Sequence, residues 1–413
     1  MKRTVFLLGA GAAIDWNGPS NPKLTELLSS NGPKNRSGQY ITKYILDHFE
    51  KETTQKINFE GLIDIIEQCI QFWSCKDTTP TIGNLLINKK DDFWNNTINY
   101  EYVGNGVQTT LNNSIRQATL TPEEKFFIYL LTSIYAGINS EISKYGSGTV
   151  NTDKIGCDEN KIINKLAQTY FTNFSKNNYL RIYTLNYDRV IQYLFHKGGL
   201  TAFQGFNSED LLPKVYGNEY QVDSKRILTS FNENCIYHLH GNYAWHIKRH
   251  ELPGIPDEIV NGYFGRIGGN RTFSFVEAEK YKLLVQSNII TGYSKVQRTN
   301  LTPFKQMASA FDIDCHAADE IIIIGYSFGD LHINETIRQA KASNPDCKIT
   351  CISPDINIGS LLLEHILWNN RSMIDNDFIQ QSKTLKKSKH YNCDIYYQSW
   401  KDYLEAHKCN QIS

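Results

Sequence analysis

Four apolar segments of this chain each end in a short polar or glycine-rich motif, and this pattern constrains the fold more than any other feature. The segments read VFLLGAGAA at 5–13, IYTLNYD at 182–188, IYHLHG at 236–241 and IIIIGYSFGD at 321–330. Short continuous apolar runs are typical of parallel strands buried on both faces. In an open parallel sheet, the ligand crevice lies outside the carboxyl ends of the strands. We therefore expect the four motifs to converge at one edge of a sheet.

The chain as a whole, residues 1–413, predicts a single α/β domain with a doubly wound, mostly parallel, Rossmann-type sheet of about six strands. The predicted strands are 4–8, 181–185, 235–239, 320–325, 348–352 and 394–398. Helical periodicity of apolar residues covers 59–73, 122–144, 160–175 and 303–318. We expect large insertions at about 76–160, helical and variable in part, and at 242–318, as a cap or second lobe over the crevice.

Composition narrows the class of protein. The 43 basic and 43 acidic residues cancel, so no net field favours nucleic acid or an anionic membrane. The nine cysteines are odd in number and scattered, which favours free thiols in a reducing compartment over disulfides or a structural metal. No apolar run approaches the ~18–20 residues of a membrane span. We expect a cytoplasmic protein and read the apolar N-terminus as a strand, because cleavage as a signal peptide would remove Gly9 and Gly11.

The glycine-rich turn after the first strand predicts a phosphate contact. Gly9 and Gly11 allow a tight turn and let the backbone approach a pyrophosphate, whose charge exposed N–H groups can satisfy. The turn does not complete the dinucleotide fingerprint, because Ile14 stands where the third glycine would be. A plain turn at a strand end is the alternative.

The second and third motifs carry candidate catalytic groups. Asn186 and Asp188 place an amide and a carboxylate two positions apart, suited to ribose hydroxyls or a water, although an Asx turn or a helix cap is the alternative. His238 and His240 point to opposite faces of their strand. His240 directly precedes the glycine that ends the strand, so it is the better candidate for a general base.

The fourth motif admits a different class of enzyme. GYSFG at 325–329 matches the G-x-S-x-G nucleophile elbow, which would make Ser327 the nucleophile of a serine hydrolase with Asp355 and His390 as partners. That interpretation leaves the N-terminal glycines and the NYD motif unexplained.

Taken in order, these motifs resemble the sirtuin family. GAGAAIDWNGPS at 9–20, NFE at 58–60, TLNYD at 184–188, HLHG at 238–241 and GYSFGD at 325–330 are most similar to the bacterial sirtuin-like NADases of phage defence. The resemblance covers the core strands from end to end, but not 76–160 or most of 242–300. It implies a Rossmann-type site for NAD as substrate, with no metal.

The resemblance also implies roles for individual residues. The turn Gly9, Ala10, Gly11 and Ala12 would hold the pyrophosphate. Asn186 and Asp188 would address the nicotinamide ribose and the water, and His240 would be the general base. Gly325, Ser327 and Asp355 would line the phosphate and adenosine-ribose side of the site.

The implied function is an NAD⁺ glycohydrolase that releases nicotinamide and an ADP-ribose species, and depletes NAD⁺ when infection triggers it. Because such an activity must be restrained in a healthy cell, we expect a homo-oligomer, a HerA-type ATPase partner, or both. The alternatives are a protein deacylase or ADP-ribosyltransferase on the same site, the serine hydrolase, and a sensor that binds NAD⁺ or ADP-ribose without turnover. A deacylase is disfavoured because DWNGPSNP replaces the GIPDFR stretch and a four-cysteine zinc ribbon is missing from the sequence.

Overall fold

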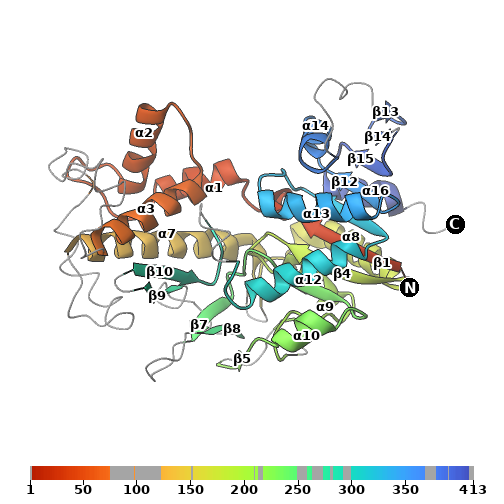
Figure 1. Cartoon of the computed structure of the whole chain (residues 1–413), viewed down its shortest axis with the longest axis horizontal. Helices are drawn as coiled ribbons and strands as arrows, with labels where there is room; N and C mark the ends of the chain where they lie inside the picture. The colour runs from red at the N-terminus through yellow and green to blue at the C-terminus, as the bar shows by residue number, and fades with distance from the viewer. Residues whose placement is uncertain are drawn as a thin grey trace. The chain divides into compact units, whose positions relative to one another are not determined.

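The computed structural model describes residues 2–74, 97, 122–149, 152–208, 210–212, 217–248, 258–262, 273–279, 282–291, 299–367, 378–388 and 390–408 (Figure 1). Of the predicted insertion at about 76–160, residues 76–96, 98–121 and 150–151 lie outside these residues. The chain divides into two compact units. The sheet unit comprises Met1–Gly18, Ser143–Asn242 and Thr299–Ser413, and the second unit comprises Pro19–Ile142 and Tyr243–Arg298.

An eight-stranded sheet, in the order β13-β14-β15-β12-β11-β1-β4-β6, forms the centre of the sheet unit. Its parallel strands are β1 (Lys2–Leu8), β4 (Asn178–Thr184), β6 (Cys235–His238), β11 (Glu320–Ile324), β12 (Lys348–Ile352) and β15 (Cys393–Tyr396). Each neighbouring pair among these six is parallel. All six predicted strands are therefore confirmed, and so is the mostly parallel Rossmann-type fold class.

Two edge strands were not predicted. β14 (Leu385–Ser388) pairs antiparallel with β15, and β13 (Phe378–Gln380) pairs antiparallel with β14. Their sequences, FIQ and LKKS, are short, and their residues are half-buried or exposed. An edge strand with a solvated face lacks the continuous apolar run of a buried parallel strand, so hydropathy alone does not reveal it.

Helices cover both faces of the sheet. On one face, α8 (Lys161–Ser175), α9 (Val190–Lys197) and α16 (Trp400–Lys408) bury their apolar sides against a cluster that includes Phe6 and Ile182. Phe6 meets Phe171 of α8 edge-to-face at 5.7 Å, a favoured geometry for aromatic rings. On the other face, α12 (Phe304–His316) and α13 (Leu331–Ser343) lie side by side (Figure 1). Tyr183 of β4 contacts Phe311 of α12 there at 4.8 Å.

A buried ion pair ties β4 to α12. The Arg181 Nε and the Asp314 Oδ2 are 2.5 Å apart, and both side chains are fully buried. Tyr183 donates its hydroxyl proton to the same Asp314 oxygen at 2.5 Å, and the Arg181 guanidinium also donates to the Glu233 carbonyl at 2.9 Å. These bonds compensate the loss of hydration that burial of the two charges requires.

The remaining elements of the sheet unit are short. They are the 3-10 helices η1 (Ala10–Trp16) and η4 (Asp158–Asn160), the helices α10 (Ser224–Thr229) and α14 (Ile358–Leu362), the π-helix η6 (Leu363–Leu367), and the strands β2 (Gly148–Thr149), β3 (Thr152–Asp153) and β5 (Glu219–Tyr220).

The second unit combines helices with two antiparallel strand pairs. Its helices are α1 (Asn21–Ser29), α2 (Ile41–Thr53), α3 (Phe59–Ser74) and most of α7 (Pro122–Gly146). β7 (Trp245–Lys248) pairs with β8 (Glu258–Gly262), and β9 (Phe273–Glu279) pairs with β10 (Lys282–Ser287). The apolar stripe predicted for 59–73 is buried along α3 at Phe59, Leu62, Ile63, Ile66 and Ile70. In the described part of the chain, no helix is both long enough and apolar enough to cross a bilayer.

Candidate active site

Two glycine turns meet at the carboxyl edge of the sheet, one after β1 and one after β11. A Cβ atom on Gly9 would lie 2.5 Å from the Gly325 carbonyl oxygen, and one on Gly11 would lie 2.7 Å from the Gly325 Cα. Gly325 itself has a φ of +62°, and a Cβ there would lie 2.3 Å from the Ala12 nitrogen. All three glycines are therefore required by the close approach of one protein backbone to another.

This packing also uses most of the amides of the first turn. The Gly9 N–H donates to the Ile324 carbonyl, the Gly11 N–H to the Gly325 carbonyl, and the Ala12 N–H to the Gly9 carbonyl, each at 2.9 Å. Ala10 is exposed and is the first residue of η1, where an N–H has no acceptor within the helix. For a pyrophosphate at this turn, the Ala10 amide is the donor that the geometry offers.

The end of β4 carries Asn186 and Asp188. Asn186 is half-buried, and its main-chain N–H donates to the Thr184 hydroxyl at 3.0 Å. Asp188 is buried, and its two carboxylate oxygens accept from the Val190 N–H at 2.9 Å and from the Tyr145 hydroxyl at 3.3 Å. Burial raises the pKa of Asp188 to about 6, because the charged form loses hydration there. The Asx turn that the sequence offered as an alternative therefore accounts for Oδ1, which accepts from the Val190 N–H. It does not account for Oδ2, which accepts from the Tyr145 hydroxyl.

His240 follows β6 and is buried. Its Nε2 lies 4.0 Å from the Asp330 Oδ2, and its ring centroid is 6.1 Å from that of His332. The loop that carries Asp330 is fixed by Tyr326, whose hydroxyl accepts from the Asp330 N–H at 3.0 Å and donates to the Asn334 side chain at 2.8 Å. A carboxylate at this place favours the protonated form of the imidazole that a general base produces.

His238 lies on β6 beneath this edge and was not selected from the sequence as a site residue. Its Nδ1 lies 2.9 Å from the Asn186 carbonyl oxygen. Its Nε2 lies 2.5 Å from the Gln192 Nε2 and 3.0 Å from the Asn242 Nδ2. Burial lowers the pKa of His238 to about 4, so the ring is neutral at neutral pH. Asn242 directly follows the HLHG motif in the sequence. That position next to the motif could have marked Asn242 as a candidate site residue.

A small cavity of about 10 Å³ joins the first three motifs. It is lined by Leu8, Ala12, Ala13, Thr184, Asn186, Asp188, Val190, Ile191, Gln192, His238 and Trp400. The ends of β1, β4 and β6 thus meet as the strand order predicts, and the contact between Gly11 and Gly325 adds the end of β11. Trp400, the first residue of α16, also lines this cavity. It belongs to none of the four motifs, so the sequence did not predict it as a site residue.

Ser327 and Asp355 lie at the outer part of the same edge, and both are exposed. Within the described part of the chain, no hydrogen bond joins the Ser327 hydroxyl to a histidine or a carboxylate. Asp355 accepts from the Asn357 N–H at 2.9 Å, as in an Asx turn. In a nucleophile elbow the serine itself occupies the strained backbone position. Here Phe328 has the positive φ, at 58°, so the geometry does not favour the serine hydrolase.

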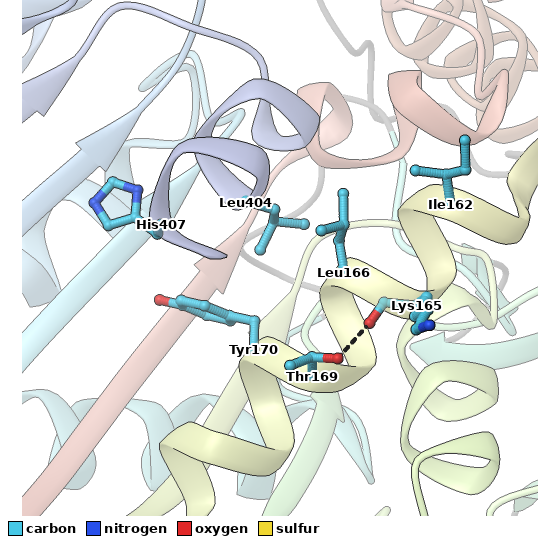
Figure 2. Close-up of a pocket in the computed structure, with 7 residues that line it drawn as sticks. All are labelled: Ile162, Lys165, Leu166, Thr169, Tyr170, Leu404 and His407. Atoms are coloured by element: carbon cyan, nitrogen blue, oxygen red, sulfur yellow. Dashed lines mark hydrogen bonds between the residues drawn. The ribbon is translucent and has the colours of Figure 1, made fainter. Parts of the chain in front are cut away.

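A larger cavity of about 200 Å³ lies between α8 and α16, away from the motifs (Figure 2). In Figure 2, the side chains of Leu166 and Leu404 meet at its centre, with Tyr170 and His407 on one side and Ile162 and Lys165 on the other. Its lining is mostly apolar and contains no site residue predicted from the sequence. The candidate acid, base and amide groups lie instead at the strand ends.

Seven of the nine cysteines lie in the described part of the chain. Cys69, Cys157, Cys235, Cys315, Cys347, Cys351 and Cys393 are free thiols, and all but Cys157 are buried. Among the described residues, no cluster of three or more histidine, cysteine, aspartate or glutamate side chains is placed to hold a metal ion.

Comparison with known proteins gives one positive finding. A search of curated proteins finds no match to this chain. Residues 180–355 match the sequence profile of the SIR2-like domain. The matched range contains Asn186, Asp188 and His240, and it also contains the GYSFGD loop and Asp355. SIR2-like domains bind and use NAD, so the match is consistent with an NAD-dependent activity. It also supports a relation of this chain to the SIR2-like family.

Proposed function

We propose that this protein is an NAD⁺ glycohydrolase that cleaves NAD⁺ to nicotinamide and ADP-ribose. One observation carries the proposal: Asn186, Asp188 and His240 lie at the ends of two adjacent parallel strands, inside the range that matches the SIR2-like domain. The packed glycine turns at Gly9 and Gly325 border the same edge. These are the groups that hydrolysis of a glycosidic bond to a neutral leaving group needs.

The reaction breaks the bond between the nicotinamide nitrogen and the ribose C1′ carbon. Nicotinamide leaves with the bonding electron pair, and the ribose gains oxocarbenium character. A water then forms the new C–O bond at C1′ and loses one proton. We assign that proton to His240, whose imidazolium form the Asp330 carboxylate at 4.0 Å stabilises. The Asn186 amide orients the ribose or the water.

The cavity at the strand ends offers a place for the attacking water. At about 10 Å³, the space beside Asn186 and Asp188 accommodates about one water molecule. Burial of Asp188 and His240 also limits the access of bulk water to the reacting groups.

The direct test is incubation of the purified protein with NAD⁺, followed by chromatography of the products. Nicotinamide and ADP-ribose in equal amounts are expected. Asn186→Ala and His240→Ala should each lower turnover by about 10²–10⁴-fold, because positioned acid–base groups contribute that much. His316→Ala is the matched control, since His316 is exposed on α12. A loss below about tenfold for both site variants would refute the assignment.

The same assay separates the alternatives. Nicotinamide release that requires an acylated lysine peptide would identify a deacylase, and label transferred from NAD⁺ to protein would identify a transferase. Binding of NAD⁺ without nicotinamide release would identify a sensor. Labelling of Ser327 by a fluorophosphonate would favour the serine hydrolase.

We further propose that the activity serves anti-phage defence and is controlled by assembly, in a homo-oligomer, with a HerA-type ATPase, or both. Uncontrolled NAD⁺ cleavage harms any cell, which is the reason to expect such control. Sedimentation across a concentration series, with NAD⁺ cleavage measured for each species and with the ATPase added, tests this proposal. A monomer that is fully active and gains nothing from either partner would refute it.

A further inference from the structure

His238 has polar contacts to three other residues at the edge of the sheet, yet the proposed reaction gives it no role. Its side chain is 2% exposed, on the last residue of β6. The ring bridges the β4 end, through the Asn186 carbonyl, to α9, through Gln192. It also contacts Asn242, two residues after His240. Each of these contacts lies within the sheet unit.

The contacts define the tautomer of the His238 ring. A carbonyl oxygen can only accept, so the contact of 2.9 Å to Asn186 requires a proton on Nδ1. The Asn242 Nδ2 donates to the Asp188 carbonyl at 3.1 Å, which fixes the orientation of that amide. The same Nδ2 lies 3.0 Å from Nε2, and the Gln192 Nε2, also an amide donor, lies 2.5 Å from it, so both neighbours favour an Nε2 that accepts. The ring is the neutral Nδ1–H form.

We propose that His238 is a positioning residue for Asn186: its Nδ1–H holds the Asn186 main-chain carbonyl and thereby sets where the Asn186 side chain lies. With Asn242 bound to the Asp188 carbonyl, the two side chains fix the turn that carries both polar groups of the NYD motif. This inference rests on the proposed function, since the turn matters for catalysis only if Asn186 acts on NAD⁺. Displacement of a reacting group by about 1 Å can lower turnover by about 10²-fold.

Three substitutions separate positioning from simple packing. His238→Asn keeps an N–H donor at the place of Nδ1 and loses the acceptor at Nε2. His238→Leu removes both polar atoms. His238→Gln reaches the place of Nε2 but leaves the Asn186 carbonyl without its donor, and it replaces the Leu variant if that variant does not fold. His246→Leu, at a histidine 1% exposed on β7 of the second unit, controls for the loss of a buried histidine.

For NAD⁺ cleavage we expect His238→Leu to lower kcat by about tenfold or more while KM changes by less than about threefold, because the turn is displaced but the rest of the site remains. His238→Asn should recover most of kcat. His246→Leu should lower the melting temperature and leave kcat unchanged. Wild-type kcat in the Leu or Gln variant would overturn the inference, and so would an equal loss of kcat in the Asn variant.

Hydrogen exchange of a peptide that spans 184–190, read by mass spectrometry, tests the same contact without activity. The Leu and Gln variants should exchange faster in this peptide than the wild type, and the Asn variant should match the wild type. Equal exchange in all variants would overturn the inference. Wild-type protein that releases no nicotinamide, but shows the expected order of exchange, would refute the proposed function and leave His238 as the residue that holds the turn.

Discussion

At the scale of single residues, the contact between Gly325 and the first turn gives a clear expectation for stability. Gly325→Ala should lower the free energy of unfolding by about 2–5 kcal/mol, since left-handed backbone at an alanine costs about 1–2 kcal/mol and overlap in a packed region about 1–3 kcal/mol more. Urea unfolding of the variant and the wild type measures the difference.

Gly199→Ala is the matched control for that measurement. Gly199 has a φ of +71°, and a Cβ there would have no atom within 4 Å. Its substitution should therefore cause only the backbone loss, about 1–2 kcal/mol. Equal losses at Gly199 and Gly325 would show that the two turns do not need their close approach.

Asp188 and His238 have opposite effects on how the free energy of unfolding changes with pH. Between pH 4 and 6, the folded chain holds a proton on Asp188, whose pKa is raised to about 6, and none on His238, whose pKa is lowered to about 4. The unfolded chain holds its proton on the histidine instead, because the reference pKa values are 3.8 and 6.5. The number of bound protons is the same in both states, so the pair contributes no net slope.

Removal of the histidine should expose the dependence on Asp188. In His238→Asn, the folded state binds one proton more than the unfolded state between pH 4 and 6. The free energy of unfolding should then fall as pH rises, by up to about 1.4 kcal/mol per unit relative to the wild type. Urea unfolding at pH 4.5 and 5.5 measures this. The charge of Arg189 also acts on His238 and is the same in both proteins. If the free energy of unfolding changes equally with pH in the wild type and in His238→Asn, the lowered pKa of His238 is contradicted.

At the scale of secondary structure, the ion pair between β4 and α12 sets how firmly that helix is attached to the sheet. Asp314→Asn should lower the free energy of unfolding by about 3–5 kcal/mol, because it leaves the fully buried Arg181 charge without its partner. Asp158→Asn is the control. Asp158 pairs with Lys161 at 2.6 Å, but both side chains are mostly exposed, so its loss should leave the melting temperature unchanged. Similar effects of the two variants would contradict this view.

The elements that the sequence predicted well share one property: their apolar residues face a core on both sides or along one helical stripe. The IIII run at 321–324 and the stripe along α3 each show such a pattern without tertiary information. β13 and β14 do not, because one row of exposed polar residues is enough for an antiparallel edge. Hydropathy therefore predicted a strand or a helix correctly where the apolar residues of that element are buried.

At the scale of the whole molecule, the sequence predicted where the site residues gather but not what each one contacts. Asn186, His240 and Gly325 were predicted to lie at one edge because the carboxyl ends of parallel strands meet there, and this prediction depends only on strand direction. The contact of Gly9 with Gly325, in contrast, depends on a distance between two backbones, and no local pattern records it. His238 was not selected from the sequence for the same reason, since its partners lie in the turn after β4, on α9 and in the loop after β6.

The central place of β1 between β4 and β11 determines the order in which the sheet can close during synthesis. The Arg3 N–H donates to Asp319, 316 residues later in the chain. At about 5–20 residues per second, a ribosome needs on the order of 15–60 s to make that stretch. Throughout this time one edge of the apolar strand VFLL lacks its partner, and an open edge of this kind recruits other strands. A fragment that ends before β11, residues 1–318, should therefore aggregate where the full chain stays in solution, and the nascent chain should depend on chaperones until β11 emerges.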